Sequence, residues 1–431
     1  MDYGHNASSP AIIKTGKMVP MQRILSFLLI FFTLFLVGCQ EPVNLPSLTT
    51  PLPSLAPEAE PMAEANPEPT LLPTANPTPT LLPEPVQLTA TVWEDLPQVP
   101  ILMYHRFNPN PGVYVNNYTT NLADFDWHLC ALYDAGFSLV ALGDWLQGNI
   151  QLQDGRRPLI ITFDDLFYAD QISLDEAGNP APYSGVGRLW AFSQEHPDFN
   201  FTVALFYNLG DKGYANHYAN GVFTVQEGWR GARAEAIAWG IEHGAIPLNH
   251  FYDHPFLNKL APAEIRWQLE ENERALREAL SSVGRQDLAK YLPNILALPY
   301  VVWPATEEGK QVLFDYLSPE GAPVAAIVEG DSAASAKLFQ APFAEGFNRW
   351  HVPRIAASSE AIAVILEMAD QIPAASHCDL GEFLANPHVL PNTISAAITA
   401  RVTSGTCPYG YYVVDQWAFY VHEDGIIQYT P

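Results

Sequence analysis

Two adjacent carboxylates end an apolar run in residues 158–171, which read PLIITFDDLFYADQ. The stretch from Leu159 to Phe163 has the composition of a buried strand, and Asp164 and Asp165 follow it directly. In parallel α/β folds, the loops at the carboxyl ends of the strands build the active site. Two acids in that position can act as a general base and as a cation ligand. An aspartate that caps the next element would give the same pattern, so this stretch alone leaves both interpretations open.

A second candidate is the pair His250 and His254 in the segment NHFYDHPFLNKL, residues 249–260. The spacing alone is a weak signal, because a chain with 12 histidines contains some His-x3-His pair by chance with roughly one-in-three likelihood. The context is more informative, since the pair follows the apolar stretch AIPL and precedes Pro255, which predicts a strand-to-helix loop. Two neutral imidazoles and one ionised carboxylate with open positions suit a divalent metal ion at pH 7.

Strand and helix patterns alternate along about 280 residues and must position these side chains. Such alternation predicts a parallel sheet covered by helices, and so many units favour closure into a barrel over a wide open sheet. The predicted strands are residues 98–107, 158–165, 201–210, 294–304 and 322–330, and the predicted helices are residues 121–137, 187–197, 232–244, 261–284 and 358–370.

Four motifs, taken in order, resemble those of the polysaccharide deacetylases of the NodB-homology type, carbohydrate esterase family 4. They are VPILMYHRF, TFDD, NHFYDHPFLNKL and LPYVVWP, and the resemblance covers about residues 98–357. It implies an α/β fold, an incomplete (β/α)7 barrel, and metal-dependent removal of acetyl groups from N-acetylglucosamine units of a polysaccharide such as chitin or peptidoglycan. In that case the chain is a hydrolase acting on linear amide bonds, and the polysaccharide is its substrate.

The resemblance also implies roles for individual residues. Asp164 matches the general base, while Asp165, His250 and His254 match the ligands of a divalent metal, zinc being the expected ion. Such an ion acidifies a water molecule and polarises the acetyl carbonyl. Tyr300 matches the tyrosine whose backbone N–H contacts the oxyanion. His351 lies in the part of the chain where the family has its catalytic acid, although a histidine of a surface loop is an equal alternative.

Several positions depart from the family's pattern. Leu166 replaces a glycine after the second aspartate, Phe251 replaces a serine or threonine after the first histidine, and Val301 replaces the glycine of the third motif. Ala297 stands where an arginine normally orients the base, and Arg354, in HVPRIAAS after a later strand, is a candidate to take its place. These departures keep a second hypothesis open, namely a non-catalytic carbohydrate-binding lipoprotein that retains the barrel.

The amino-terminal part resembles a bacterial lipoprotein signal. Basic residues precede an apolar run that is too short to be a comfortable membrane span, and LVGC then places Cys39 where a lipobox has its lipidated cysteine. Residues 1–39 are the predicted signal peptide and residues 40–92 a Pro-rich, disordered linker. An uncleaved anchor helix is the alternative, and either interpretation places the rest of the chain outside the cytoplasm. With the lipobox, we expect an extracytoplasmic protein that meets the membrane through its lipid anchor alone. A net charge of −26 argues against nucleic acid as a partner.

The carboxyl-terminal part has a different composition from the barrel. We assign residues 93–372 to the barrel and residues 373–431 to a small β-rich module. Because Cys39 is expected to carry lipid, Cys378 and Cys407 are the expected disulfide in an oxidising compartment. The remaining Cys130 lies in an apolar helical pattern and is predicted to be a buried thiol.

Overall fold

The computed structural model describes residues 85–109, 118–166, 169–210, 229–330, 338–384 and 391–429. The predicted signal peptide with Cys39, and the linker as far as residue 84, lie outside these residues. No helix in the described ranges is both long enough and apolar enough to span a membrane.

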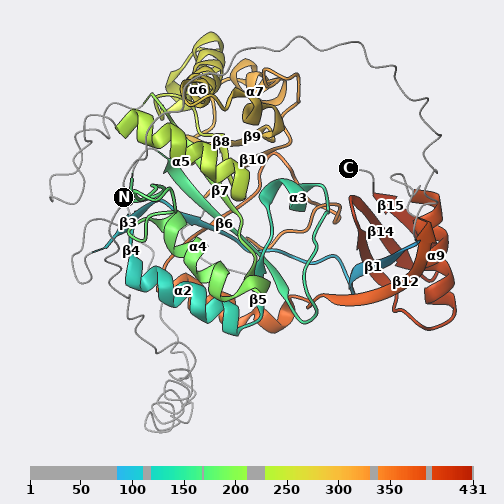
Figure 1. Cartoon of the computed structure of the whole chain (residues 1–431). Helices are drawn as coiled ribbons and strands as arrows, with labels where there is room; N and C mark the ends of the chain where they lie inside the picture. Colours follow the sequence, from blue (N-terminus) through green and yellow to red (C-terminus); the bar gives the residue numbers. More distant parts are fainter. Residues whose placement is uncertain are drawn as a thin grey trace, which may run out of the picture. The chain divides into compact units, whose positions relative to one another are not determined.

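The main sheet is parallel and follows the strand order β10-β9-β8-β7-β6-β2-β11, with β5 beside β6 (Figure 1). Its strands are β2 (Ile101–Tyr104), β5 (Phe137–Leu139), β6 (Arg157–Leu166), β7 (Val203–Tyr207), β8 (Ala245–Asn249), β9 (Ile295–Ala297), β10 (Ala326–Val328) and β11 (Ile355–Ala356). A short parallel pair, β3 (Arg106–Asn108) and β4 (Thr119–Asn121), lies apart from it.

The two ends of this sheet meet only loosely. β11 pairs with β2, and the residues just before β11 reach β10 through one isolated bridge between Val328 and Val352. The backbone N–H of Glu329 donates to the carbonyl of Val352 at 2.8 Å. Within the described part of the chain, β10 and β11 share no regular ladder. The fold is therefore an incomplete (β/α) barrel, as the sequence predicted.

Helices surround the barrel. They are α2 (Leu122–Asp134), α3 (Leu142–Leu146), α4 (Gly185–Glu195), α5 (Trp229–His243), α6 (Pro262–Ser282), α7 (Glu307–Phe314) and α8 (Ser359–Glu367). Most of them lie on its outside, whereas Leu142 and Trp145 of α3 pack in the same cluster as Ile160. Shorter 3-10 turns are η1 (Pro197–Phe199), η3 (Leu257–Lys259), η4 (Gln286–Tyr291), η5 (Pro299–Val301) and η7 (Ala369–Gln371). Side chains that cap the first turn set where several helices begin. The hydroxyl of Ser184 accepts from Gly187 N in α4, and that of Ser358 accepts from Ala361 N in α8.

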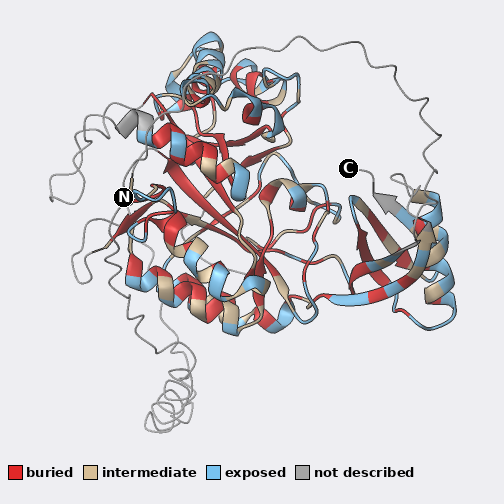
Figure 2. Ribbon diagram, viewed as in Figure 1, coloured by how far each residue is buried: buried red, intermediate tan, exposed pale blue. Residues whose placement is uncertain are grey.

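Strand β6 is buried on both faces, which explains its continuous apolar sequence (Figure 2). Leu159, Ile161 and Phe163 pack under the helices, whereas Ile160 belongs to the cluster inside the barrel. Because side chains alternate along a strand, Asp164 follows Ile160 and Thr162 on the inner face. The barrel interior is filled mainly by the apolar cluster that contains Ile160, and the buried side chain of Arg354 lies directly against the carboxylate.

A second, antiparallel sheet corrects the predicted domain limits. Its order is β12-β1-β13-β14-β15, and its strands are β1 (Pro85–Trp93), β12 (Ser376–Leu384), β13 (Gly410–Val414), β14 (Trp417–His422) and β15 (Gly425–Tyr429). The linker prediction is thus wrong for residues 85–92, because β1 pairs with both β12 and β13 and buries Ala90 and Val92. Helix α9 (Pro391–Thr403), which the sequence did not predict, packs on this sheet through Ile394 and Ile398.

The predicted disulfide joins Cys378 on β12 to Cys407, with their Cα atoms 5.8 Å apart. A bridge that closes a loop of this length contributes on the order of 3 kcal/mol. The prediction that Cys130 is buried is wrong, because this residue is half-buried on α2.

Candidate metal centre and active site

The two adjacent acids lie at an irregularity in β6. The register between β6 and β7 shifts between Phe163 and Leu166, and Asp165 has φ of +59°. In a regular strand, neighbouring side chains point to opposite faces. The bulge instead allows both carboxylates to lie near the mouth, where His250 Nε2 is 4.0 Å from Asp164 Oδ2 and 3.5 Å from Asp165 Oδ1.

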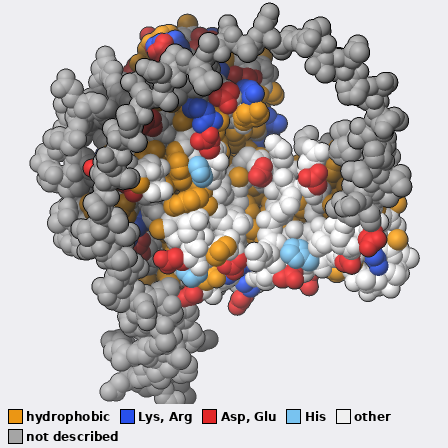
Figure 3. Space-filling view, in the orientation of Figure 1, with side chains coloured by type: hydrophobic (Ala, Val, Ile, Leu, Met, Phe, Trp, Pro, Cys, Tyr) orange, Lys and Arg blue, Asp and Glu red, His pale blue; other side chains and the backbone are white. Residues whose placement is uncertain are grey.

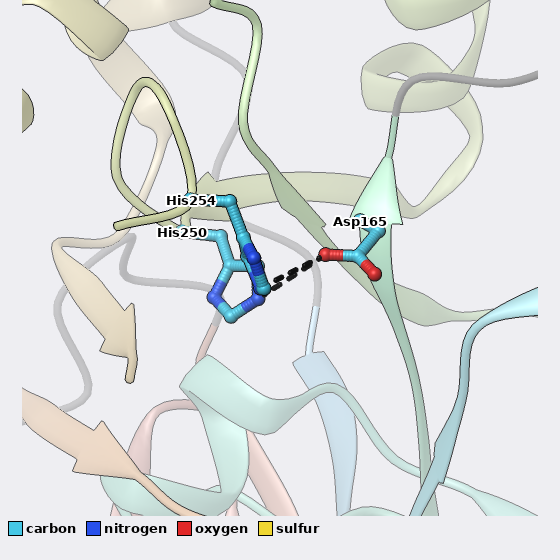
Figure 4. A group of neighbouring side chains, drawn as sticks. All are labelled: Asp165, His250 and His254. Atoms are coloured by element: carbon cyan, nitrogen blue, oxygen red, sulfur yellow. Dashed lines mark ion pairs between the residues drawn. The ribbon is translucent and has the colours of Figure 1, made fainter. Parts of the chain in front are cut away.

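Asp165 lies against two histidines that come from the β8 side of the barrel (Figure 4). Its Oδ1 is 3.5 Å from His250 Nε2 and 3.3 Å from His254 Nε2. One ligand atom from each of the three residues lies within 4.8 Å of the others, and all three residues are buried. The structure thus brings together the three predicted ligands in an arrangement that can hold a metal ion.

Hydrogen bonds orient two of these side chains. His250 Nδ1 is 2.9 Å from the carbonyl oxygen of Ala297, so a proton on Nδ1 would be donated there and Nε2 would face Asp165. Asn208, at the end of β7, donates from Nδ2 to Asp165 Oδ1 at 3.3 Å. His254 follows on the next loop with φ of +50°.

The electrostatics of the cluster keep Asp165 and His254 in the protonation states that bind a metal ion. Burial raises the pKa of Asp165, but the hydrogen bond with His250 and the nearby imidazoles outweigh it and hold that pKa well below its ordinary value. Burial lowers the pKa of His254 to about 4, so this ring is neutral at pH 7. Burial also lowers the pKa of His250, yet the bond to Asp165 and both carboxylates raise it overall. A cation at this point would compete with the proton on His250.

Asp164 is bound by the arginine predicted to approach it. Arg354 Nη1 and Nη2 donate to Asp164 Oδ1 and Oδ2 at 2.5 and 2.7 Å, and both side chains are almost fully buried. Arg354 also donates to Thr162 Oγ1 and to the carbonyl of Glu329, each at 3.0 Å. Burial raises the pKa of Asp164, but the guanidinium outweighs this and holds it below its ordinary value. Asp164 is therefore an oriented carboxylate, ionised at neutral pH.

His351 forms a pair with an acid that the sequence analysis missed. Its Nδ1 lies 3.2 Å from Glu329 Oε1, its side chain is about half exposed, and its ring lies 4.6 Å from that of Trp303. The indole N–H of Trp303 donates to the same carboxylate oxygen of Glu329. Glu329 directly follows β10, so a carboxylate at the carboxyl end of a predicted strand was a readable signal.

Tyr300 lies in a turn with an unusual backbone. Tyr300 and Val301 have φ of +56° and +58°, a conformation that suits glycine and is rare for a β-branched residue. The turn at this motif therefore takes a left-handed conformation although Val301 has replaced the glycine. The ring of Tyr300 is half exposed, lies 4.4 Å from that of His254 and stacks on Phe256 at 4.1 Å.

A cavity of about 550 Å³ lies elsewhere, near the amino-terminal ends of β7 and β8. Residues of the β5–α3 segment, together with Asn200, Gly244 and Tyr291, contribute to its lining. None of the residues of the candidate centre lines it, so the chemistry inferred above belongs to the opposite ends of the strands.

No family model and no curated protein matches the chain. Among solved structures, a Streptococcus pyogenes deacetylase, PplD in complex with acetate, is 14% identical, with a TM-score of 0.40, and the match covers 63% of this chain and 98% of that one. IcaB from Ammonifex degensii is 16% identical, with a TM-score of 0.39, over 64% of this chain and 99% of that one. A polysaccharide deacetylase from Bacillus cereus is 15% identical, with a TM-score of 0.39, over 62% and 69%. More than a third of this chain is thus without a counterpart in these structures.

Proposed function

We propose that this chain is a metal-dependent polysaccharide N-deacetylase that hydrolyses the acetamido groups of N-acetylglucosamine units. The observation that carries the proposal is the division of two neighbouring acids between different partners. Asp164 is held by Arg354, whereas Asp165 faces His250 and His254. The proposed substrate class, a polysaccharide with N-acetylglucosamine units, rests on the order of the four sequence motifs.

The donor set fits a divalent ion, which we propose to be zinc. Asp165, His250 and His254 would hold it, since zinc in catalytic sites takes three protein ligands and keeps one position open. The bond between His250 and Ala297 O orients that ring toward the cluster. When bound, such an ion acidifies a water molecule and polarises the acetyl carbonyl.

The chain's own residues then divide the proton transfers. Asp164 accepts a proton from the attacking water, and Arg354 keeps its carboxylate ionised and oriented. The backbone N–H of Tyr300 is the proposed donor to the oxyanion. His351, held by Glu329, donates a proton to the leaving amine as the C–N bond breaks, which releases acetate and a free amino group on the sugar.

A non-catalytic carbohydrate-binding protein is the alternative, and one observation favours it. A general base works best when its pKa lies near the working pH. Burial would raise the pKa of Asp164, but Arg354 holds it below the ordinary value, which weakens the carboxylate as a base. The half-exposed rings of Phe256 and Tyr300 could stack on a sugar under either hypothesis.

We further propose that Cys39 carries lipid and tethers the chain to the outside of a bacterial membrane. The sequence of the lipobox supports this location. Acidic side chains are spread over the face shown in Figure 3, in keeping with the net charge of −26, so electrostatic attraction to anionic lipids is not expected. Replacing Cys39 by serine should release the protein from the membrane fraction, and a variant that remains there would contradict the anchor.

The decisive experiment measures acetate release from chitin oligomers, poly-N-acetylglucosamine and peptidoglycan. We expect release from at least one polymer, loss of release after chelation, and recovery when zinc is added back. His254→Ala should abolish tight metal binding, whereas His377→Ala, which alters a histidine beside Asp154, should leave metal content and turnover unchanged. Metal binding without acetate release from any of the polymers would favour the carbohydrate-binding alternative.

A further inference from the structure

Asn272 is a fully buried amide on α6, a helix that supplies none of the candidate ligands. Its Nδ2 donates to Tyr207 O at 2.7 Å and to Asn249 Oδ1 at 2.8 Å. Its Oδ1 accepts from Leu209 N at 3.0 Å. These three hydrogen bonds all go to residues at or just after the ends of β7 and β8, where the candidate centre lies.

The first set of these bonds brackets Asn208. Residues 207 and 209, on either side of Asn208, are both bound by the Asn272 amide. Asn208 in turn donates to Asp165 Oδ1, the oxygen that faces both imidazoles. Fixing the backbone on both sides of Asn208 therefore fixes the amide that orients the carboxylate ligand.

The second set brackets His250. Asn249 Oδ1 accepts from Asn272 and also from Phe251 N at 2.9 Å, so the residues before and after His250 are tied together. Phe251 has φ of +64°, a conformation that a phenylalanine rarely adopts without support. The N–H of His250 donates to Tyr207 O, which also accepts from Asn272.

We propose that Asn272 is a positioning residue for the metal centre, acting through Asn208 and Asn249. This inference rests on the proposed metal-binding function and extends it to a residue that touches no ligand atom. A metal site needs its ligands held in place by the hydrogen bonds behind them, and loss of such a bond typically weakens metal affinity by about 10–100-fold.

The test compares Asn272→Asp with Asn294→Asp in the whole chain. Asn272→Asp keeps the shape and the acceptor for Leu209 N but loses both N–H donors and turns an oxygen toward two acceptors. Asn294 is a similarly buried amide that donates to Ala322 O at the amino-terminal end of β9, so it serves as the matched control. Each metal-free protein is titrated with zinc, and its thermal midpoint is recorded in chelator.

We expect zinc affinity to fall about 10–100-fold in Asn272→Asp and to stay at the wild-type value in Asn294→Asp, while both thermal midpoints drop. Equal zinc affinity of Asn272→Asp and wild type would overturn the positioning role and leave the proposed function standing. A folded wild type that binds no divalent ion would instead overturn the proposed function, and the positioning role with it.

If Asn272→Asp does not fold, Asn249→Ala decides the question. It removes the acceptor for Phe251 N but leaves the bonds from Asn272 to Tyr207 and Leu209. A loss of zinc affinity supports positioning through Asn249, and an unchanged affinity overturns that part of the proposal.

Discussion

Replacing Asp164 by asparagine separates the two neighbouring acids by their chemistry. The change removes one charge and keeps the shape of the side chain. If Asp164 is the general base, turnover should fall about 10²–10⁴-fold while zinc content stays at the wild-type level. Asp165→Asn should fail differently, by losing the metal, because Asp165 Oδ1 is the atom that faces both imidazoles.

The same substitution also carries a cost in stability that follows from the structure. Asp164 and Arg354 are 3% and 1% exposed and share two hydrogen bonds. Removing one partner of a buried ion pair costs about 3–5 kcal/mol, because the other charge stays buried. Arg354 keeps its bonds to Thr162 Oγ1 and Glu329 O, so we expect the lower end of that range. Urea unfolding of the metal-free protein measures it.

A matched control distinguishes lost chemistry from lost stability. Asp170 is also fully buried and pairs with Arg106 at 2.9 Å, with a further bond from Phe107 N. Asp170→Asn should cost a similar free energy of unfolding but change acetate release only a few-fold when assayed well below the midpoint. If Asp164→Asn releases acetate within about 10-fold of the wild-type rate, Asp164 is not the base and the proposed mechanism is refuted.

Three further predictions follow from the same geometry. The pKa of Asp164 is depressed below 3.8, so the pair with Arg354 stabilises the fold fully above that pH and loses its effect as the pH falls through the lower folded value; acid unfolding should be less steep in Asp164→Asn than in wild type. Val301→Gly should raise the free energy of unfolding by about 1 kcal/mol, because glycine adopts φ of +58° without strain; a loss of stability in thermal unfolding would contradict this. Replacing both Cys378 and Cys407 by alanine should lower the free energy of unfolding by about 3 kcal/mol. Unfolding followed by far-UV circular dichroism should then show the second sheet lost before the barrel.

The barrel was predictable because its elements carry their periodicity locally. The run from Leu159 to Phe163 is apolar since both faces of β6 are covered, and a reader of the sequence sees that directly. Helix α6 begins at Pro262, one residue after its predicted start, because proline suits the first turn of a helix. The contact between Arg354 and Asp164 was predicted by a chemical requirement, namely that a buried carboxylate needs a cation to stay ionised.

The second sheet was less predictable because its pairing is long-range. Gln87 on β1 lies 292 positions before Asp379, its neighbour on β12. The segment VQLTATVW, residues 86–93, does alternate between apolar and polar residues, but it adjoins a Pro-rich stretch that suggested a linker. No local feature of the sequence indicates that β1, so far along the chain from β12 and β13, completes the carboxyl-terminal sheet. Glu329 differs, because its position directly after β10 could have been noticed in the sequence, and only its pairing with His351 depends on a separate segment.

Ala297 stands where the sequence pattern led us to expect an arginine, yet a cation still lies beside Asp164. Ala297 ends β9, is fully buried, and contributes its carbonyl oxygen to His250 rather than a side chain to Asp164. Arg354 lies 190 positions after Asp164, and it precedes β11, which reaches β6 from the other side through β2. The strands are parallel and curl around one interior, so side chains from either direction along the sheet meet at the same mouth. Here the cation comes from the residue before β11 instead of from the end of β9, where the buried Ala297 stands.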